Sequence, residues 1–209
     1  MGYFFSLEGC EGAGKSTVLK LLADTLKQKG FRVVTTREPG GIEIAEQIRN
    51  VILDRNNVKM DEKTEALLYA AARRQHLVEK IIPELDKGSI VLCDRFVDSS
   101  LTYQGYARGI GINEVLTINK FAIEDYMPDL TIYLDVPPEV GLARINKDKN
   151  REVNRLDVES LQFHAKVREG YHLLLKQYPD RILMINAQND IDIVHREVLN
   201  KILQFINAR

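Results

Sequence analysis

The amino-acid sequence predicts an α/β fold in which helices cover both faces of a five-stranded parallel sheet. Short apolar runs rich in β-branched and aromatic residues alternate with longer stretches of helical periodicity, and this alternation is typical of βαβ units. Each apolar run is continuous, as expected for a strand covered on both faces. Because no repeat, low-complexity tract or linker interrupts the chain, we expect a single three-layer domain over residues 1–209.

The expected strands and helices follow one another in order along the chain. Strands are expected at residues 3–7, 31–35, 89–93, 130–134 and 181–185. Helices are expected from residue 15 to about 29, at 44–53, at 61–86, and near the end of the chain, where Ile191, Val194, Val198 and Ile202 share one face. We expect their apolar stripes to pack on the sheet. Residues 146–155 form the one irregular excursion.

Composition and charge exclude several classes of protein. The 209 residues include 29 Lys and Arg against 30 Asp and Glu, a net charge of −1, which argues against a general binder of nucleic acid or of membrane surfaces. Two cysteines are too few for a disulfide framework. With neither a signal peptide nor an apolar run long enough to span a membrane, a reducing cytoplasm is the expected setting.

Residues 9–16 (GCEGAGKS) match the phosphate-binding pattern G-x-x-x-x-G-K-S/T. The match follows an expected strand and opens an expected helix, so backbone N–H groups and the helix N-terminus can surround phosphate oxygens. Lys15 would reach the β- and γ-phosphates, and the Ser16 hydroxyl would coordinate Mg²⁺. The candidate ATP contacts are Gly9, Cys10, Glu11, Gly12, Ala13, Gly14, Lys15, Ser16 and Thr17, with Arg144 from the basic segment described below. We expect the Cys10 thiol to be incidental.

Asp94 directly follows a buried strand, where a carboxylate can hold a metal ion through water. Ser16 and Asp94 are therefore the candidate Mg²⁺ residues. A strand-ending Asp can also simply cap a turn, but Arg95 beside it offers a planar cation suited to two phosphoryl groups brought together.

The irregular segment is basic. Residues 144–155 carry Arg144, Lys147, Lys149, Arg151 and Arg155 against Asp148 and Glu152, a local charge of +3. A solvated helix end would explain such a run. Opposite a phosphate loop, a short basic lid over about residues 146–156 that closes on the transferring phosphates is the better interpretation.

Several motifs in the same order give the whole chain a resemblance to the bacterial thymidylate kinases, a family of P-loop nucleoside monophosphate kinases. The motifs lie at residues 5–9 (FSLEG), 37–41 (REPGG), 68–74 (LYAAARR), 94–100 (DRFVDSS), 103–105 (YQG) and 154–157 (NRLD). The resemblance implies a P-loop NTPase fold and transfer of the γ-phosphate of ATP to dTMP with Mg²⁺. It also implies a homodimer.

The resemblance implies roles for residues at the reacting phosphates. Arg95 would bridge the acceptor phosphate and the transferred group, and Arg49 would help to hold the acceptor phosphate. Glu38 would serve the metal–phosphate centre together with Asp94. Because Gly12 stands where some members place Arg, the transition-state cations are expected from the lid, as Arg151 and Arg155.

For the nucleoside of dTMP, the resemblance implies a second set of contacts. Tyr69 would stack on the base, Arg73 would donate to a thymine carbonyl, and Ser100 and Gln104 would contact the pyrimidine edge. Tyr103 would crowd the place of a 2′-hydroxyl, and Glu11 would accept from the 3′-hydroxyl. Three residues depart from common family choices: Tyr69 replaces Phe, Phe96 replaces Tyr, and Glu11 replaces Asp.

Other interpretations stay open at this point. A related kinase could act on dUMP, CMP or AMP, and a nucleotide-dependent switch would bind ATP or GTP without a phosphoryl acceptor. The guanine-reading pattern of a GTP switch is incomplete, since Lys149 stands where an acid is needed. Tyr69 and Arg73, four residues apart on one helix face, could also be a packing pair. The histidines, His76, His164, His172 and His195, lack metal-ligand spacing, and we expect them at the surface or its boundary.

Overall fold

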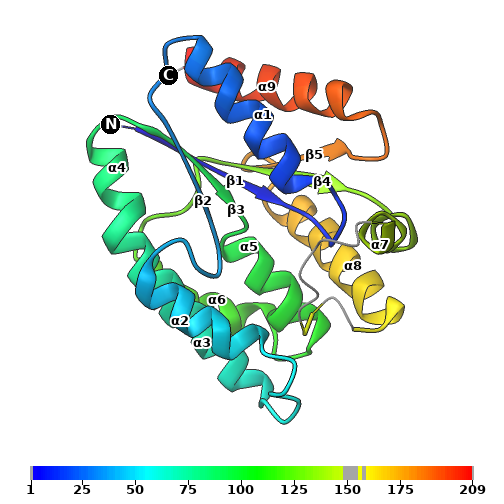
Figure 1. Cartoon of the computed structure of the whole chain (residues 1–209). Helices are drawn as coiled ribbons and strands as arrows, with labels where there is room; N and C mark the ends of the chain where they lie inside the picture. The colour runs from blue at the N-terminus through cyan, green and yellow to red at the C-terminus, as the bar shows by residue number, and fades with distance from the viewer. Residues whose placement is uncertain (1, 148–154, 157–158, 209) are drawn as a thin grey trace.

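The computed structural model describes residues 2–147, 155–156 and 159–208. Five parallel strands form one sheet in the order β2-β3-β1-β4-β5. The strands are β1 (Tyr3–Glu8), β2 (Val33–Arg37), β3 (Ile90–Asp94), β4 (Leu130–Asp135) and β5 (Ile182–Asn186). Helices lie on both faces of the sheet (Figure 1), so the predicted α/β architecture is confirmed.

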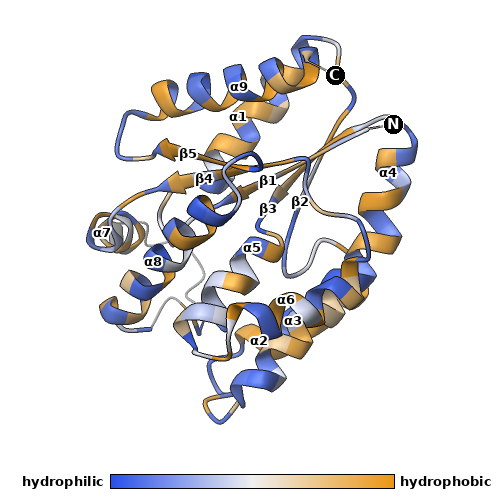
Figure 2. Ribbon diagram, turned by 180° about the vertical axis from the view of Figure 1, so that it is seen from behind, coloured by the Kyte–Doolittle hydropathy of each residue, from blue (hydrophilic) through white to orange (hydrophobic). Residues whose placement is uncertain are grey.

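Two helices cover one face of the sheet, α1 (Lys15–Gln28) and α9 (Ile191–Asn207) (Figure 1). Val18 and Leu22 of α1 and Val198 of α9 join one buried cluster with Phe5 and Leu7 of β1. The strands of Figure 2 are coloured mainly as hydrophobic, in keeping with cover on both faces.

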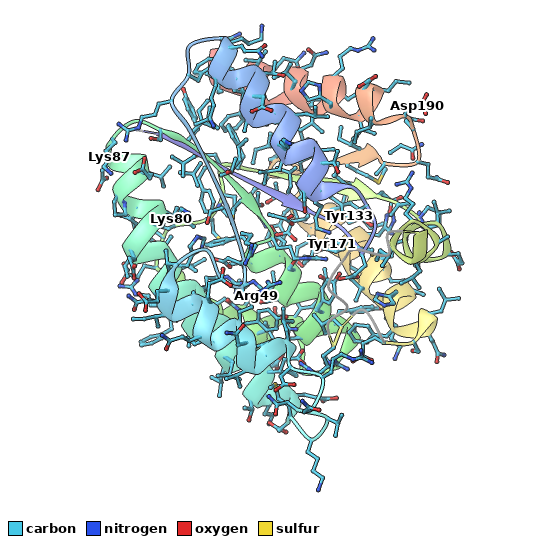
Figure 3. All side chains as sticks on the ribbon, in the orientation of Figure 1. Arg49, Lys80, Lys87, Tyr133, Tyr171 and Asp190 are labelled. Atoms are coloured by element: carbon cyan, nitrogen blue, oxygen red, sulfur yellow. The ribbon has the colours of Figure 1, made fainter. Side chains whose placement is uncertain are left out.

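The other helices, apart from α7, gather on the opposite face. They are α2 (Glu43–Leu53), α3 (Glu62–His76), the π-helical segment η1 (Leu77–Ile81), α4 (Ile82–Asp86), α5 (Val97–Ser100), the π-helical segment η2 (Leu101–Ala107), α6 (Ile112–Ile123) and α8 (Leu161–Gln177). Phe4, Val91 and Tyr133 of the sheet belong to the core on this side. Tyr133 stacks on Tyr171 of α8 with ring centroids 4.6 Å apart (Figure 3). Helix α7 (Pro138–Lys147) lies near the ends of the strands, and its Val140 packs against the cluster formed with α1 and α9.

The structure differs from the sequence-based expectations in its helices. The helix expected at 61–86 is present as α3, η1 and α4 in succession. Helix α2 packs mainly on α3, whereas the sequence predicts that it packs on the sheet. The helices at 97–107, 112–123, 138–147 and 161–177 were not expected. Several of them bury polar side chains, including Asp98, Thr102, Asn119 and His164, which weakens the apolar periodicity on which the prediction depends. None of the helices in the described part of the chain is long and apolar enough to cross a membrane.

A buried carboxylate at the end of β1 sets the position of the site. Glu8 is fully buried and accepts hydrogen bonds from the Phe96 backbone N–H at 2.7 Å, the Ser99 hydroxyl at 2.5 Å and the Tyr171 hydroxyl at 2.9 Å. It thereby joins β1 to the segment after β3 and to α8. Burial, followed by the charge of Asp98, raises the pKa of Glu8 from 4.5 to about 7.

The raised pKa of Glu8 makes stability depend on pH. Between the unfolded value of 4.5 and about 7, the folded protein holds this proton more tightly than the unfolded chain does, so the contribution of Glu8 to stability falls as pH rises. Glu8→Gln keeps an acceptor for Phe96 and removes the titration. We expect the free energy of unfolding of this variant, relative to the original protein, to rise by about 2 kcal/mol between pH 5 and pH 8.

Urea unfolding at several pH values measures this difference. The matched control is Glu197→Gln on an exposed site of α9, for which the difference should stay constant. Parallel stability curves for Glu8→Gln and the original protein would contradict the assignment.

Candidate functional site

The loop between β1 and α1 has the conformation of a phosphate cradle. Gly12 and Gly14 adopt left-handed backbone angles, with φ of 72° and 86°, which turn the chain tightly before the N-terminus of α1. Lys15 is buried, and its Nζ donates to the carbonyls of Gly9 and Cys10, each at 3.0 Å. Burial lowers the pKa of Lys15. The Cys10 thiol is also buried, and burial together with the charge of Glu11 raises its pKa to about 12. The thiol is therefore a poor nucleophile.

Helix α7 lies directly against this loop. A Cβ placed on Gly12 would come within 2.0 Å of the Gly141 carbonyl oxygen, so the two backbones touch without intervening side chains. Arg144, one turn further along α7, donates to the Ala187 carbonyl at 2.9 Å and lies 3.4 Å from the Gly12 carbonyl. The structure therefore places Arg144 beside the phosphate loop.

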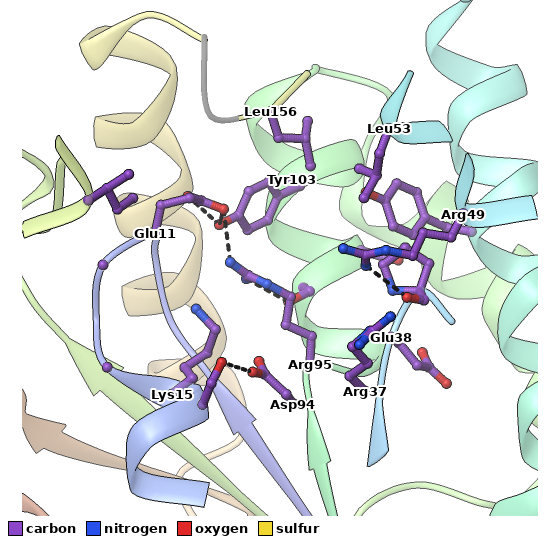
Figure 4. Close-up of a pocket in the computed structure, with 18 of the residues that line it drawn as sticks. Glu11, Lys15, Arg37, Glu38, Arg49, Leu53, Asp94, Arg95, Tyr103 and Leu156 are labelled. Atoms are coloured by element: carbon purple, nitrogen blue, oxygen red, sulfur yellow. Dashed lines mark hydrogen bonds and ion pairs between the residues drawn. The ribbon is translucent and has the colours of Figure 1, made fainter. Parts of the chain in front are cut away.

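Ser16 and Asp94 form an oxygen pair at the mouth of the loop. The Ser16 hydroxyl donates to the Asp94 carboxylate at 2.8 Å (Figure 4). Mg²⁺ prefers oxygen ligands and in phosphoryl-transfer sites takes few from the protein, the rest from phosphates and water. A hydroxyl and a carboxylate beside a phosphate loop fit that ion.

Arg95 connects the loop to the other side of the cavity. Its φ of 71° is unusual for a residue with a side chain. The guanidinium donates to Glu11 at 2.8 Å and to the Gly9 carbonyl at 2.9 Å, and it lies 5.0 Å from the centre of the Tyr103 ring (Figure 4). The Tyr103 hydroxyl lies 2.8 Å from both oxygens of Glu11. Burial alone would raise the pKa of Glu11, but Arg95 and then His164 hold it below its usual range.

These groups surround a cavity of about 580 Å³ that runs from the phosphate loop to α2 and α3. Most of the residues predicted from the sequence line it: Glu11, Gly12, Gly14, Lys15, Ser16, Thr17, Glu38, Arg49, Tyr69, Arg73, Asp94, Arg95, Ser100, Tyr103, Gln104 and Arg144. The volume is in the range of a small-molecule site. One cavity therefore joins the expected donor and acceptor sets.

The far wall of the cavity is a buried charge network around Arg73. Its Nε donates to Glu38 at 2.7 Å, and its Nη1 donates to the Ser100 hydroxyl at 3.1 Å and to Asn119. The other oxygen of Glu38 lies 2.9 Å from Nδ1 of His76. Both Glu38 oxygens are thus engaged by side chains of α3.

The expectation that the histidines lie at the surface is wrong for two of them. His76 is 0% exposed and His164 is 1% exposed. Each lies beside a buried carboxylate, His76 at Glu38 and His164 at 3.2 Å from Glu11. An imidazole can be buried when such a partner offsets the loss of water, and sequence spacing carries no sign of a partner so far along the chain. His172 and His195 are partly exposed.

Arg49 and Arg155 reach the site from different directions. Arg49 of α2 lines the cavity and donates to the Pro39 carbonyl at 2.9 Å (Figure 4). Arg155 donates to the Ile52 carbonyl at 3.0 Å and to Glu65, so the structure attaches it to α2 and α3 and does not bring it to the phosphate loop. Arg151 and most of the expected lid at 146–156 lie outside the described residues.

Several buried residues that contact the predicted set are absent from the sequence-based prediction of the site. They are Glu65, His76, Ser99, Asn119 and His164. A signal existed for Glu65, because Glu65, Tyr69 and Arg73 follow one another at four-residue spacing and so share one face of α3.

Comparisons of the sequence and of the structure with known proteins point to the same family. The family model described as Thymidylate kinase matches residues 7–198. A thymidylate kinase of Clostridium novyi (strain NT) is 61% identical over 197 residues, which cover 94% of this chain and 96% of the relative. One from Geobacillus sp. (strain WCH70) is 57% identical over 208 residues, covering 100% and 99%. The crystal structure of thymidylate kinase from Ehrlichia chaffeensis superposes with a TM-score of 0.78 at 35% identity, covering 98% of this chain and 99% of that one.

Proposed function

Because the chain belongs to the thymidylate kinase family, we propose that its cavity transfers the γ-phosphate of ATP to dTMP through the residues assigned below. The observation that carries the assignment is the continuity of the cavity, which holds Lys15 and Ser16 at one end and Tyr69, Arg73 and Gln104 at the other. Arg95 lines the same cavity and contacts both Glu11 of the phosphate loop and the ring of Tyr103. Two phosphorylated substrates can therefore meet at one guanidinium.

The phosphate loop binds the donor. Its backbone N–H groups and Lys15 hold the β- and γ-phosphates, and Arg144 and Thr17 complete the ATP side. Ser16 and Asp94 would hold Mg²⁺, which when bound neutralises charge on the phosphate oxygens. Lys15 already lies across the loop, where its Nζ donates to two backbone carbonyls.

The acceptor oxygen needs no general base. A phosphate monoester has a second pKa of about 6 and is largely ionised at neutral pH. The protein therefore contributes position and positive charge: Arg95 and Arg49 hold the acceptor phosphate, and Arg95 also faces the transferred group. Arg151 remains the proposed lid cation.

The nucleoside end of the cavity selects the acceptor. Tyr69 stacks on the base while Arg73, Ser100 and Gln104 meet its polar edge. Tyr103 and Glu11, already in contact, bound the space of the sugar, with Glu11 placed to accept from a 3′-hydroxyl.

Two proposed roles change in the light of the geometry. Glu38, engaged by Arg73 and His76, is better suited to positioning Arg73 than to serving the metal–phosphate centre. Arg155, attached to Glu65 and to the Ile52 carbonyl, is better suited to anchoring the end of the lid beside the acceptor.

We also propose that the chain acts as one kinase domain, in the cytoplasm, as a homodimer. Its two cysteines are buried thiols, which suits a reducing compartment. Helices α3 and α6 pack together and leave Leu67 55% exposed and Phe121 90% exposed. Such apolar exposure is typical of an interface between subunits.

An acceptor panel tests the function. ADP formation from Mg·ATP should be fastest with dTMP, and the ribose form of TMP should be disfavoured because Tyr103 crowds its 2′-hydroxyl. The panel also includes dUMP, dCMP, AMP and GMP. Preference for another monophosphate would leave a kinase with a different pocket assignment, and nucleotide binding without acceptor-dependent turnover would favour a switch.

Arg95→Ala should lower kcat by at least about 100-fold, because it removes charge stabilisation at the reacting phosphates. ATP binding, measured with a fluorescent nucleotide, should survive and weaken far less than kcat falls, since Lys15 and the loop backbone remain even though Glu11 loses its partner. Arg32→Ala, at an exposed arginine, is the matched control and should keep normal turnover. Near-normal turnover in Arg95→Ala would remove Arg95 from the chemistry.

Phe121→Glu should convert the dimer to monomer, because it places a charge in an apolar interface. Light scattering after size-exclusion chromatography measures the mass, and Glu197→Gln serves as the surface control. A dimer that survives the substitution would place the interface elsewhere.

A further inference from the structure

The Gln104 side chain can present either of two chemical faces to the base. It is 2% exposed and lines the cavity. Its amide has an accepting oxygen and a donating NH₂ group at nearly the same positions, so a half turn about the last bond exchanges them. The direction in which the amide is held therefore decides which base edge it can bind.

Pyrimidines differ at that edge. Thymine and uracil present a donating N3–H beside an accepting C4 carbonyl, whereas cytosine presents an accepting N3 beside a donating amino group. An amide oxygen facing N3 favours thymine and uracil, and an NH₂ facing N3 favours cytosine.

Glu65 determines the direction of the Gln104 amide. This carboxylate is 1% exposed, and its Oε1 accepts a hydrogen bond from Gln104 Nε2 at 2.8 Å. Its Oε2 accepts from Arg155 and lies 3.6 Å from Arg108. An ionised carboxylate can only accept, so Gln104 must turn its nitrogen toward Glu65 and leave its oxygen as the acceptor.

We propose that Glu65 is a positioning residue for acceptor specificity: by fixing the Gln104 amide, it selects pyrimidine monophosphates that carry N3–H over cytosine. The inference rests on the proposed binding of the acceptor base between Tyr69, Arg73 and Gln104. A buried carboxylate then orients the side chain on each side of the base edge. Glu38 fixes Arg73, which donates to the base, and Glu65 fixes Gln104 so that its oxygen accepts from the base. Together they complement a carbonyl next to an N–H.

Glu65→Gln is the sharpest test because it is nearly isosteric. The guanidinium groups of Arg155 and Arg108 would attract the new carbonyl oxygen to the Oε2 side, and the new NH₂ would then face Gln104. Gln104 would have to turn its oxygen toward residue 65 and present its NH₂ to the base. We expect kcat/KM for dTMP and dUMP to fall together by about tenfold, mainly through KM, while kcat/KM for dCMP is unchanged or rises.

Comparison with Glu65→Asp separates orientation from packing. Asp retains a carboxylate that can only accept, so the ratio of kcat/KM for dTMP to that for dCMP should stay closer to the original, although Asp leaves a larger void than Gln. If Glu65 acted through packing alone, the ratio would stay closer to the original in Glu65→Gln than in Glu65→Asp. Glu62→Gln, an exposed carboxylate near the start of the same helix, is the matched control and should leave all three substrates unchanged.

The outcomes separate the two proposals. An equal loss for all three substrates, or an unchanged ratio in Glu65→Gln, would overturn the role of Glu65. Absence of dTMP turnover in the original protein would instead overturn the proposed function. If Glu65→Gln does not fold, Gln104→Ala provides the test: it should lower the dTMP-to-dCMP ratio by about tenfold, and an unchanged ratio would overturn the proposal.

Discussion

The ion pair between Arg95 and Glu11 is the contact on which the rest of the site depends. Arg95 belongs to the segment after β3 and Glu11 to the phosphate loop after β1, so their 2.8 Å contact joins neighbouring strand ends. Both side chains are largely buried, and removing one partner of such a pair typically costs about 3–5 kcal/mol. Tyr103 adds its hydroxyl to the same carboxylate. The pair therefore sets the distance between the loop and the acceptor side before any substrate arrives.

The acceptor side repeats the same construction with other residues. Glu38 holds Arg73 and His76, and Glu65 holds Gln104 and Arg155. In each case a buried carboxylate accepts from side chains that come from distant parts of the chain. Charges buried in this way are costly unless paired, so each network restrains its members to one arrangement. A pocket built from restrained donors and acceptors loses less freedom on binding than one built from mobile side chains.

Much of the fold could be predicted from the sequence, because buried parallel strands are continuous apolar runs and the phosphate loop has a fixed pattern. All five strands lie within two residues of their expected starts. The order of the strands in the sheet could not be predicted. The helices at 97–107 and 161–177 could not be predicted either, because the buried faces of these helices carry Asp98, Thr102 and His164. These polar residues are buried because their partners are far along the chain, such as Arg181 for Asp98. For the same reason the spacing on α3 placed Tyr69 and Arg73 together but gave no partner for Glu65.

The direct backbone contact between Gly12 and Gly141 limits how this site can change over evolution. Any side chain at position 12 would collide with the α7 backbone, and that backbone cannot yield as the end of a flexible side chain can. An arginine at this position would therefore require the α7 backbone to shift. That shift would also move Arg144 from the Ala187 carbonyl. The close fit of two glycines thus disfavours a cation at position 12, and an additional cation for the phosphates is expected from another part of the chain.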